Sequence, residues 1–298
     1  MNSETKGLWL GLAGVTLFAM TTPMTRLAVG SVADPQLPPL FVTAGRAALA
    51  AVLSAVYLLL TRAPLPKARH LVPLLVSALG TVIGFPLFLS LALRQVDAMH
   101  AAVVTGLLPL GTAVVAAFAL RQRPSTGFWA CAVLGFALVL GFALHAGGGV
   151  SGADALLLLA VLSASVGYVA GARLSVEWSA EHVICWVLVL SVPLTWPVTW
   201  LAWPTQAVSA SAWLGFAYVT LFSMWIGFFA WYRGLALGGT MRVSQVQLVQ
   251  PFLTLLFAVP VLGERLDAVT LLFSLAVIAT VFAGKKMPTN RPLKEVSS

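Results

Sequence analysis

Charged residues are scarce in this sequence. Only 9% of its 298 residues are charged, whereas 60% are hydrophobic, and soluble globular domains have roughly a quarter of their residues charged. This scarcity excludes an ordinary soluble domain and indicates an integral membrane protein, whose main partner is the lipid bilayer. The net charge is +8, but the Lys and Arg residues stand mostly at the ends of apolar runs. Nucleic-acid binding is therefore not expected, because it needs cations clustered against phosphates.

Acidic residues are fewer than basic residues, and none lies in the middle of an apolar run. Proton-coupled pumps usually hold Asp, Glu or His inside the membrane, where titration can be linked to movement. We therefore expect no buried acid for proton coupling. If the chain moves a solute across the membrane, the sequence favours downhill transport or exchange. Coupling through a histidine is the alternative. The nine acids stand in loops, tails or the ends of runs: Glu4, Asp34, Asp97, Asp154, Glu177, Glu181, Glu264, Asp267 and Glu295.

The sequence also lacks the patterns of catalytic and metal sites. Its two cysteines, Cys131 and Cys185, fall inside apolar runs, which is typical of buried small hydrophobic residues rather than of a disulfide or a metal pair. No pair of histidines has the spacing of a zinc motif, and no Gly-x-Ser-x-Gly or phosphate-binding loop occurs. We expect neither an enzyme nor a bound metal or cofactor.

Long apolar runs make up most of the chain. A helix of about 20 apolar residues crosses a bilayer core of about 30 Å. The first run is longer than the core of a cleaved signal peptide, so we expect it to be retained. The predicted fold is an all-α membrane protein of ten transmembrane helices. The ten runs cover residues 7–29, 37–60, 71–93, 98–120, 127–146, 153–172, 182–202, 210–232, 241–262 and 267–284.

Part of the chain is duplicated. Residues 98–125 match residues 240–267 when Pro109 is placed on Pro251, an offset of 142 residues (251 − 109). A match of this length in register indicates an internal repeat. Proline breaks helix hydrogen bonding inside a span, and broken helices at matching positions of two halves are where transporters build their binding sites.

The offset spans five apolar runs, an odd number, so the second half inserts in the opposite direction to the first. We therefore predict two inverted five-helix repeats, residues 1–146 and 147–284, whose junction near the membrane midplane holds the substrate site. Residues 285–298 form a basic tail, which we place in the cytoplasm.

The cations set the predicted orientation. If the N-terminus is cytoplasmic, only Arg26, Arg94 and Arg265 of the 17 Lys and Arg residues fall at outer breaks, and Arg46 lies within a run. Cytoplasmic loops carry an excess of Lys and Arg. Both termini are therefore expected in the cytoplasm, with the chain crossing the cell inner membrane.

Glycine pairs spaced four residues apart recur in three runs. They are Gly7/Gly11, Gly80/Gly84 and Gly167/Gly171. Small residues at this spacing let membrane helices approach closely, although glycine is also frequent in membrane helices in general. Each pair therefore marks a helix contact or reflects that frequency.

Arg46 is the one charge near the middle of a run. A cation at this depth is costly unless it is paired or hydrated. It is a candidate partner for a substrate carboxylate or a candidate gate. The alternative is an arginine that bonds backbone carbonyls or extends its head group to the membrane boundary.

Polar and aromatic side chains in other runs are further candidates. Gln247 precedes Pro251 on the ninth run, and an amide there binds a neighbouring helix or a polar ligand. His100 begins the fourth run, where an ordinary interfacial histidine is the alternative to a cavity ligand. Tyr168 and Trp225 lie well inside their runs and could line an aromatic pocket, with core packing as the alternative.

These features resemble the EamA branch of the drug/metabolite transporter superfamily. The resemblance is carried by the mid-helix proline and Gly-Glu-Arg close of LVQPFLTLLFAVPVLGERL, by Arg46 after a Pro-Pro helix start, and by ten short-looped runs. Within that branch the chain is most similar to the YddG-type exporters of aromatic amino acids. In the first copy Arg121-Gln122 replaces Gly-Glu, which weakens any role for that acid in the first half.

The resemblance implies ten helices around a central cavity lined by spans 1, 3, 4, 6, 8 and 9, with spans 5 and 10 at the edge. It implies export of neutral or aromatic amino acids by alternating access. Efflux of other small metabolites or drugs is the alternative, and cationic cargo is disfavoured by the absence of a mid-membrane acid. The expected cavity residues are Thr21, Thr22, Met24, Phe85, His100, Tyr168, Trp225 and Gln247, with Arg46 as a further candidate.

Overall fold

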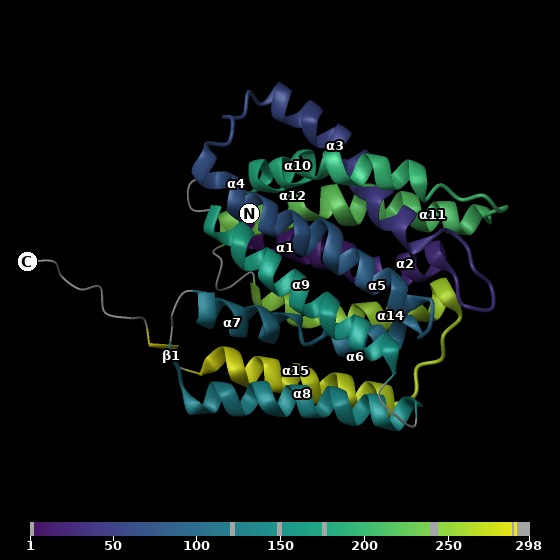
Figure 1. Cartoon of the computed structure of the whole chain (residues 1–298). Coiled ribbons are helices and arrows are strands. Elements are labelled where there is room, and N and C mark those ends of the chain that lie inside the picture. The colour runs from purple at the N-terminus through teal and green to yellow at the C-terminus, as the bar shows by residue number, and fades with distance from the viewer. Residues whose placement is uncertain are drawn as a thin grey trace, which may run out of the picture.

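The computed structural model describes residues 3–119, 123–147, 151–174, 178–238, 244–287 and 289–290, and this part of the chain forms ten spans that run side by side (Figure 1). Eight spans are long and apolar enough to cross a membrane, and two shorter apolar helices, Val246–Leu262 and Ala268–Gly284, complete the set. The first span begins, and the last span ends, at the same end of the bundle (Figure 1). The predicted all-α membrane fold is confirmed.

The spans are built from these helical segments. The first is α1 (Ser3–Ala19) with α2 (Thr21–Val29), the second α3 (Pro39–Leu60), and the third α4 (Ala68–Ser77), η1 (Ala78–Gly84) and α5 (Phe85–Leu93). The fourth is α6 (Ala98–Thr105) with α7 (Leu108–Ala119), the fifth α8 (Thr126–Gly147), and the sixth α9 (Gly152–Leu174). The seventh is α10 (Ala180–Leu201), and the eighth is α11 (Ala210–Tyr218), η2 (Val219–Ile226) and α12 (Gly227–Gly238). The ninth is η3 (Ser244–Val249) with α14 (Gln250–Leu262), and the tenth α15 (Ala268–Lys286). The two-residue strands β1 (Arg123–Pro124) and β2 (Thr289–Asn290) pair antiparallel.

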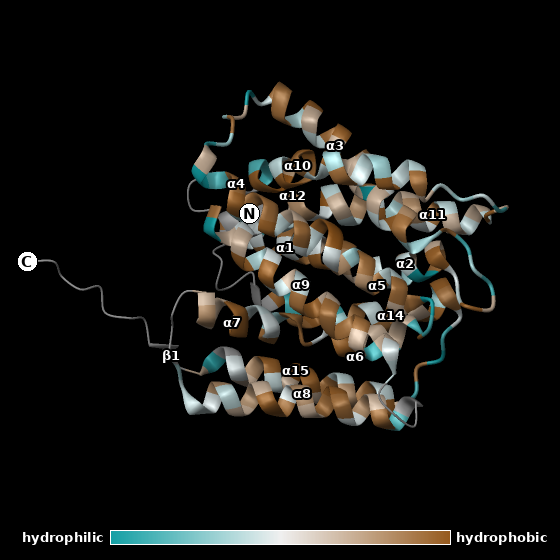
Figure 2. Ribbon diagram, viewed as in Figure 1, coloured by the Kyte–Doolittle hydropathy of each residue, from teal (hydrophilic) through white to brown (hydrophobic). Residues whose placement is uncertain are grey.

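The outer surface of the bundle is apolar. Leu59, Leu60 and Leu201 are among many large hydrophobic side chains that are exposed. Hydrophobic residues cover the length of the helices while polar ones gather at their ends (Figure 2). Lipid tails are as apolar as leucine, so this surface fits a bilayer. Within each helical segment the backbone groups bond internally, as a bilayer requires.

The third and eighth spans share an interruption. Each carries a π-helical stretch, Ala78–Gly84 and Val219–Ile226, and the offset of 142 residues places Gly84 on Ile226. Stretches of π-helix are rare and concentrate at functional sites. The two halves therefore widen the same helix at the same position.

The fourth and ninth spans share a second interruption. Pro109 and Pro251 are each the second residue of a new helical segment, α7 and α14. Proline is tolerated there because the first helical N–H groups have no intrahelical partner. The predicted twin prolines thus start segments instead of kinking continuous helices, since α6 ends at Thr105 before the first and the 3₁₀ segment η3 ends at Val249 before the second.

The contacts between spans follow the duplication: adding or subtracting five from the span numbers of one contacting pair gives another contacting pair. The first span packs on the eighth through α1 and α12, and the third packs on the sixth through α5 and α9. The shift converts one pair into the other. The pairs α3 with α10 and α8 with α15 map onto themselves, and α8 and α15 form one edge of the bundle (Figure 1), as the resemblance implies.

Glycine allows close contact between the third and sixth spans and between the first and eighth spans. A Cβ on Gly80 would lie 2.4 Å from the Ser163 carbonyl oxygen and 2.7 Å from the Gly167 Cα atom. In the partner contact, a Cβ on Gly234 would lie 2.6 Å from the Gly11 nitrogen. The backbones touch without side chains between them, so the predicted glycine pairs mark helix contacts.

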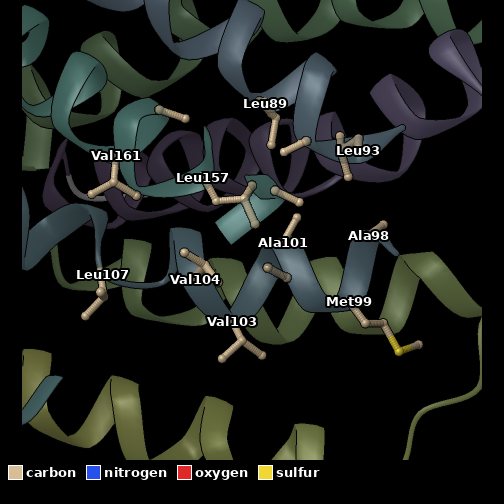
Figure 3. Close-up of a cluster of buried hydrophobic side chains, with 14 of the residues drawn as sticks. Leu89, Leu93, Ala98, Met99, Ala101, Val103, Val104, Leu107, Leu157 and Val161 are labelled. Carbon is tan, nitrogen blue, oxygen red and sulfur yellow. The ribbon is translucent and has the colours of Figure 1, made fainter. Parts of the chain in front are cut away.

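A hydrophobic cluster holds α6 in place. Leu89 and Leu93 of α5 and Leu157 of α9 face Ala101, while Met99 and Val103 point to the opposite side of α6 (Figure 3). Every one of these side chains is buried. Because α6 also packs on α14, this cluster fixes the junction between the two halves.

Candidate functional site

A cavity of about 330 Å³ lies where the interrupted spans meet. It is bounded by the breaks between α1 and α2, α6 and α7, and η3 and α14, and by both π-helical stretches. A helix interruption leaves backbone groups without their helical hydrogen bonds. Within a membrane such groups are tolerated only where they are buried in protein or line a water-filled cavity. The lining includes Phe18, Thr21, Thr22, Arg46, Thr81, Phe85, Thr105, Pro109, Thr112, Tyr168, Ser223, Phe228, Gln247, Gln250, Pro251 and Thr254.

Six predicted residues share this cavity. Thr21 and Thr22 come from α2, Arg46 from α3, Phe85 from α5, Tyr168 from α9 and Gln247 from η3. The spans that contribute them are distant in sequence and are brought together by the duplicated packing. The predicted spans 1, 3, 4, 6, 8 and 9 all contribute, joined by Arg46 of the second span and Ile278 of the tenth.

Three predicted residues do not line this cavity. Met24 packs against the hydrophobic cluster around α6. Trp225 belongs to a separate cluster and its ring centroid lies 4.9 Å from that of Phe229. It lies two positions beyond Ser223, and residues at this spacing do not share a helix face. His100 lies at a second cavity described below.

The offset of 142 residues relates cavity residues in three pairs, and sequence reasoning missed all of them except Gln247. Thr81 corresponds to Ser223, Thr112 to Thr254, and Thr105 to Gln247, and every one of them lines the cavity. A search for polar residues at both members of an offset pair would have found them. The site is therefore symmetric in position although not in side chain.

Arg46 is the polar centre of the cavity. It is only 3% exposed and lies seven residues into α3, about 10 Å from the helix start at 1.5 Å per residue. Its Nη2 donates to the Ser223 hydroxyl at 3.4 Å and to the Met224 sulfur at 3.5 Å, and Ser223 in turn accepts from Thr21 at 2.8 Å. Among the described residues its Nε and Nη1 have no hydrogen-bond partner. Arg46 therefore bonds no backbone carbonyl in the described part of the chain, and it stays within the bundle.

Hydrogen bonds join several helix ends at one end of the bundle, and we call this set of contacts the seal. The Glu264 carboxylate, just beyond α14, accepts hydrogen bonds from the backbone nitrogens of Ala98 at 2.7 Å and Met99 at 2.8 Å. These are the first N–H groups of α6, where the helix dipole favours a negative charge. Burial nevertheless raises the pKa of Glu264, against the effect of the two backbone hydrogen bonds.

Arginines complete the seal. Arg26 donates to the carbonyls of Leu93 and Gly30, and Arg94 donates to the carbonyls of Val29 at 3.3 Å and Leu37 at 3.2 Å. The ends of α2 and α5 are thereby tied together. Away from this seal, the cavity lining extends along α7 to Ala116, within one turn of the end of that helix at Ala119.

A model of the EamA-like transporter family matches residues 5–144 and again residues 151–283. The chain belongs to the EamA-like transporter family. The family is one of membrane transporters and not of enzymes. The two matches fall one on each half of the duplicated architecture.

Two comparisons accompany the family match. This EamA-like chain is 45% identical over 289 residues to YdeK of Bacillus subtilis (strain 168), which is described as an uncharacterized transporter, with 96% of this chain and 99% of that protein covered. The fold is also similar to that of a crystal structure whose description names it only as a protein. The similarity covers 94% of this chain and 96% of the other chain, with a TM-score of 0.62 and 18% sequence identity. The second likeness concerns the fold alone.

A second cavity of this EamA-like transporter, about 520 Å³, lies at the sealed end. His100 Nε2 lies 2.6 Å from Asp154 Oδ1, and Ser151 donates to Asp154 Oδ2 through its backbone nitrogen and its hydroxyl. Asp154 is only 3% exposed. The prediction that no acid is buried is therefore wrong for Asp154, because neighbouring helix ends cover the first turn of α9.

Proposed function

We propose that this EamA-like transporter exports neutral and aromatic amino acids by alternating access, as a uniporter or an exchanger. The observation that carries the proposal is the central cavity, which joins aromatic rings to hydroxyl and amide groups at the junction of the two halves. Rings from Phe18, Phe85, Tyr168 and Phe228 line it. Its volume falls within the range typical of small-molecule sites.

Six residues are proposed to bind the substrate: Thr21, Thr22, Arg46, Phe85, Tyr168 and Gln247. The rings offer apolar surface to a side chain, while the hydroxyls, the amide and the guanidinium offer polar contacts to the amino-acid backbone. Met24, Trp225 and His100 are then supporting residues, because their side chains lie outside this cavity.

The proposed conformation is inward-facing. With both termini in the cytoplasm of an inner-membrane protein, the Glu264 seal lies on the outer side and the cavity extends toward the inner end along α7. The proposed moving units are residues 1–146 and 147–284. Because Glu264 belongs to one unit and Ala98 to the other, opening the outer end requires their separation.

Downhill movement is supported by the chemistry of the lining. Among the described residues of the central cavity there is no Asp, Glu or His, so no group there titrates near neutral pH. The His100 and Asp154 pair favours a second candidate, efflux of other small metabolites or drugs with proton coupling. Buried histidine and acid pairs are a common means of linking protons to movement.

The test is counterflow of labelled phenylalanine, threonine and a nucleoside in proteoliposomes, with and without a proton gradient. We expect phenylalanine flux that is insensitive to the gradient and is reduced by Tyr168→Ala. Phe136→Ala, which removes an exposed ring from α8, is the matched control. Flux that collapses with the gradient and with Asp154→Asn would instead support the proton-coupled candidate.

A further inference from the structure

Arg46 carries donors that the protein does not use. A guanidinium has five N–H donors, and only those of Nη2 have partners among the described residues, at long distances to Ser223 and Met224. Nε and Nη1 are buried without a hydrogen bond. Buried polar groups are nearly always bonded, so these donors indicate a ligand that supplies the missing acceptors.

The charge of Arg46 is also uncompensated. Among the described residues that line the central cavity it is the only charged side chain, and no described carboxylate forms an ion pair with it. A charge in a low-dielectric site acts strongly on its surroundings. An anionic group entering this cavity is attracted and a cationic group is repelled.

The geometry of a guanidinium suits one anion well. Its planar fork donates two parallel hydrogen bonds to a carboxylate, which is the strongest neutralising contact available to it. An ammonium group, by contrast, would find only neutral acceptors around the cavity, such as Thr22, Thr105 and Gln247. The site therefore treats the two charges of an amino acid unequally.

We propose that Arg46 is a carboxylate subsite and that cargo is selected by its carboxylate and apolar tail, and not by its amino group. This inference rests on the proposed function, since it takes the central cavity as the transport site. It extends the cargo to amphipathic monocarboxylates that lack an amino group. It excludes aromatic amines that lack a carboxylate.

The experiment compares three probes with one ring: L-phenylalanine, 3-phenylpropionate and 2-phenethylamine. Each is tested for binding, by the shift in melting temperature of the detergent-purified protein, and for trans-stimulated efflux from proteoliposomes. We expect 3-phenylpropionate to bind and to exchange. Phenethylamine should bind at least about tenfold more weakly, because a hydrogen bond to a charged group is worth about that factor or more.

Variants of Arg46 connect the selectivity to this side chain. Arg46→Gln should weaken binding of both carboxylates by at least about tenfold and remove the discrimination against the amine. Arg46→Lys, which keeps the charge without the fork, should retain part of the carboxylate preference. Arg233→Gln removes an exposed cation from α12 and should leave binding unchanged.

Two results would overturn the inference: equal binding of phenethylamine and 3-phenylpropionate by the wild type, or unchanged carboxylate binding by Arg46→Gln. If Arg46→Gln does not fold, the wild-type selectivity and the lysine variant still decide the matter. If 3-phenylpropionate binds through Arg46 while phenylalanine is not moved, the amino-acid function fails and the subsite stands. If phenylalanine is moved without carboxylate preference, the carboxylate subsite fails and the amino-acid function stands.

Discussion

Glu264 and Met99 lie 165 residues apart and are joined by a 2.8 Å hydrogen bond from the Met99 backbone nitrogen to the carboxylate. The Ala98 nitrogen binds the other carboxylate oxygen at 2.7 Å. The side chain of Glu264, two residues beyond the end of the ninth span, thereby binds the first turn of the fourth. The two contacting segments belong to opposite halves of the duplicated chain, so the bond crosses the junction between them.

Loss of the Glu264 carboxylate should open the sealed end. Glu264→Ala removes both hydrogen bonds, whereas Glu264→Gln keeps one acceptor oxygen, so the alanine variant should have the larger effect. Each lost bond to a charged group costs about 1.5–3 kcal/mol, which predicts at least about tenfold faster labelling. The measurement is modification of a cysteine placed at Ala102, by an impermeant reagent added on the side of residues 94–98, with Cys131 and Cys185 replaced.

Asp97→Asn is the control for that labelling. The Asp97 carboxylate is 71% exposed and lies 3.8 Å from Arg26, and exposed ion pairs contribute little. Its labelling rate should match that of the wild type. Equal rates for Glu264→Ala and wild type would show that the seal does not depend on this carboxylate.

The sequence was sufficient for much of this architecture. Ten apolar runs and the alignment of Pro109 with Pro251 predicted the spans, their duplication and the inversion of the second half. The π-helical stretches could not be foreseen, because hydropathy is the same for an α-helical and a π-helical turn. The burial of Asp154 was also missed. The sequence shows that Asp154 stands at the end of an apolar run, but it does not show that helix ends from elsewhere in the chain cover it.

Part of the cavity was also predictable. Arg46 stood out as a charge within an apolar run, and Gln247 as an amide four residues before a repeated proline. Trp225 illustrates the limit. Its place well inside the eighth run indicated its depth but not its direction. Ser223 and Met224 line the cavity, and a residue two positions beyond Ser223 does not share its helix face.

Gly80→Ala should destabilise the protein. The new methyl group would lie 2.4 Å from the Ser163 carbonyl oxygen, and overpacking of this kind typically costs about 1–3 kcal/mol. The measurement is thermal unfolding in detergent. Gly152→Ala is the matched control, because a Cβ there meets nothing within 4 Å, and an unchanged melting temperature for Gly80→Ala would contradict the close backbone contact.

Phe85→Ala should weaken binding of aromatic cargo without unfolding the transporter. The ring is only partly buried and lines the central cavity, and ring-to-ring contacts contribute about 0.5–1.5 kcal/mol beyond area burial. We expect a loss of several-fold up to about tenfold in phenylalanine affinity, measured by competition in counterflow. Phe136→Ala, on the exposed side of α8, should leave that affinity unaltered; a similar loss there would point to an indirect effect.

Asp267 should make stability depend on acid pH. Its carboxylate caps α15 by accepting from the Thr270 backbone nitrogen at 2.7 Å and from the Thr270 hydroxyl at 2.9 Å, and the backbone bond is the main reason that its pKa is lowered from 3.8. An acid with a lowered pKa stabilises the folded state fully above its ordinary pKa, and this contribution is lost as pH falls through the lowered value.

The comparison is between wild type and Asp267→Ala in thermal unfolding from pH 7 to pH 3. The variant should lose about 1 kcal/mol at neutral pH, as for other helix caps. That difference should stay constant down to about pH 4 and then shrink, because the ordinary pKa of aspartate is about 3.9. Thr270→Val keeps the backbone bond and should retain most of the acid dependence; a difference that grows below pH 4 would reverse the assigned sign.

The matched π-helical stretches in the third and eighth spans also record the history of the chain. A π-helical stretch holds more residues per turn than the helix around it, and here both halves carry one at equivalent positions. Independent acquisition would require the same change twice, in segments that now insert in opposite directions. A single π-helical stretch in the five-helix unit, copied when that unit was duplicated, accounts for both.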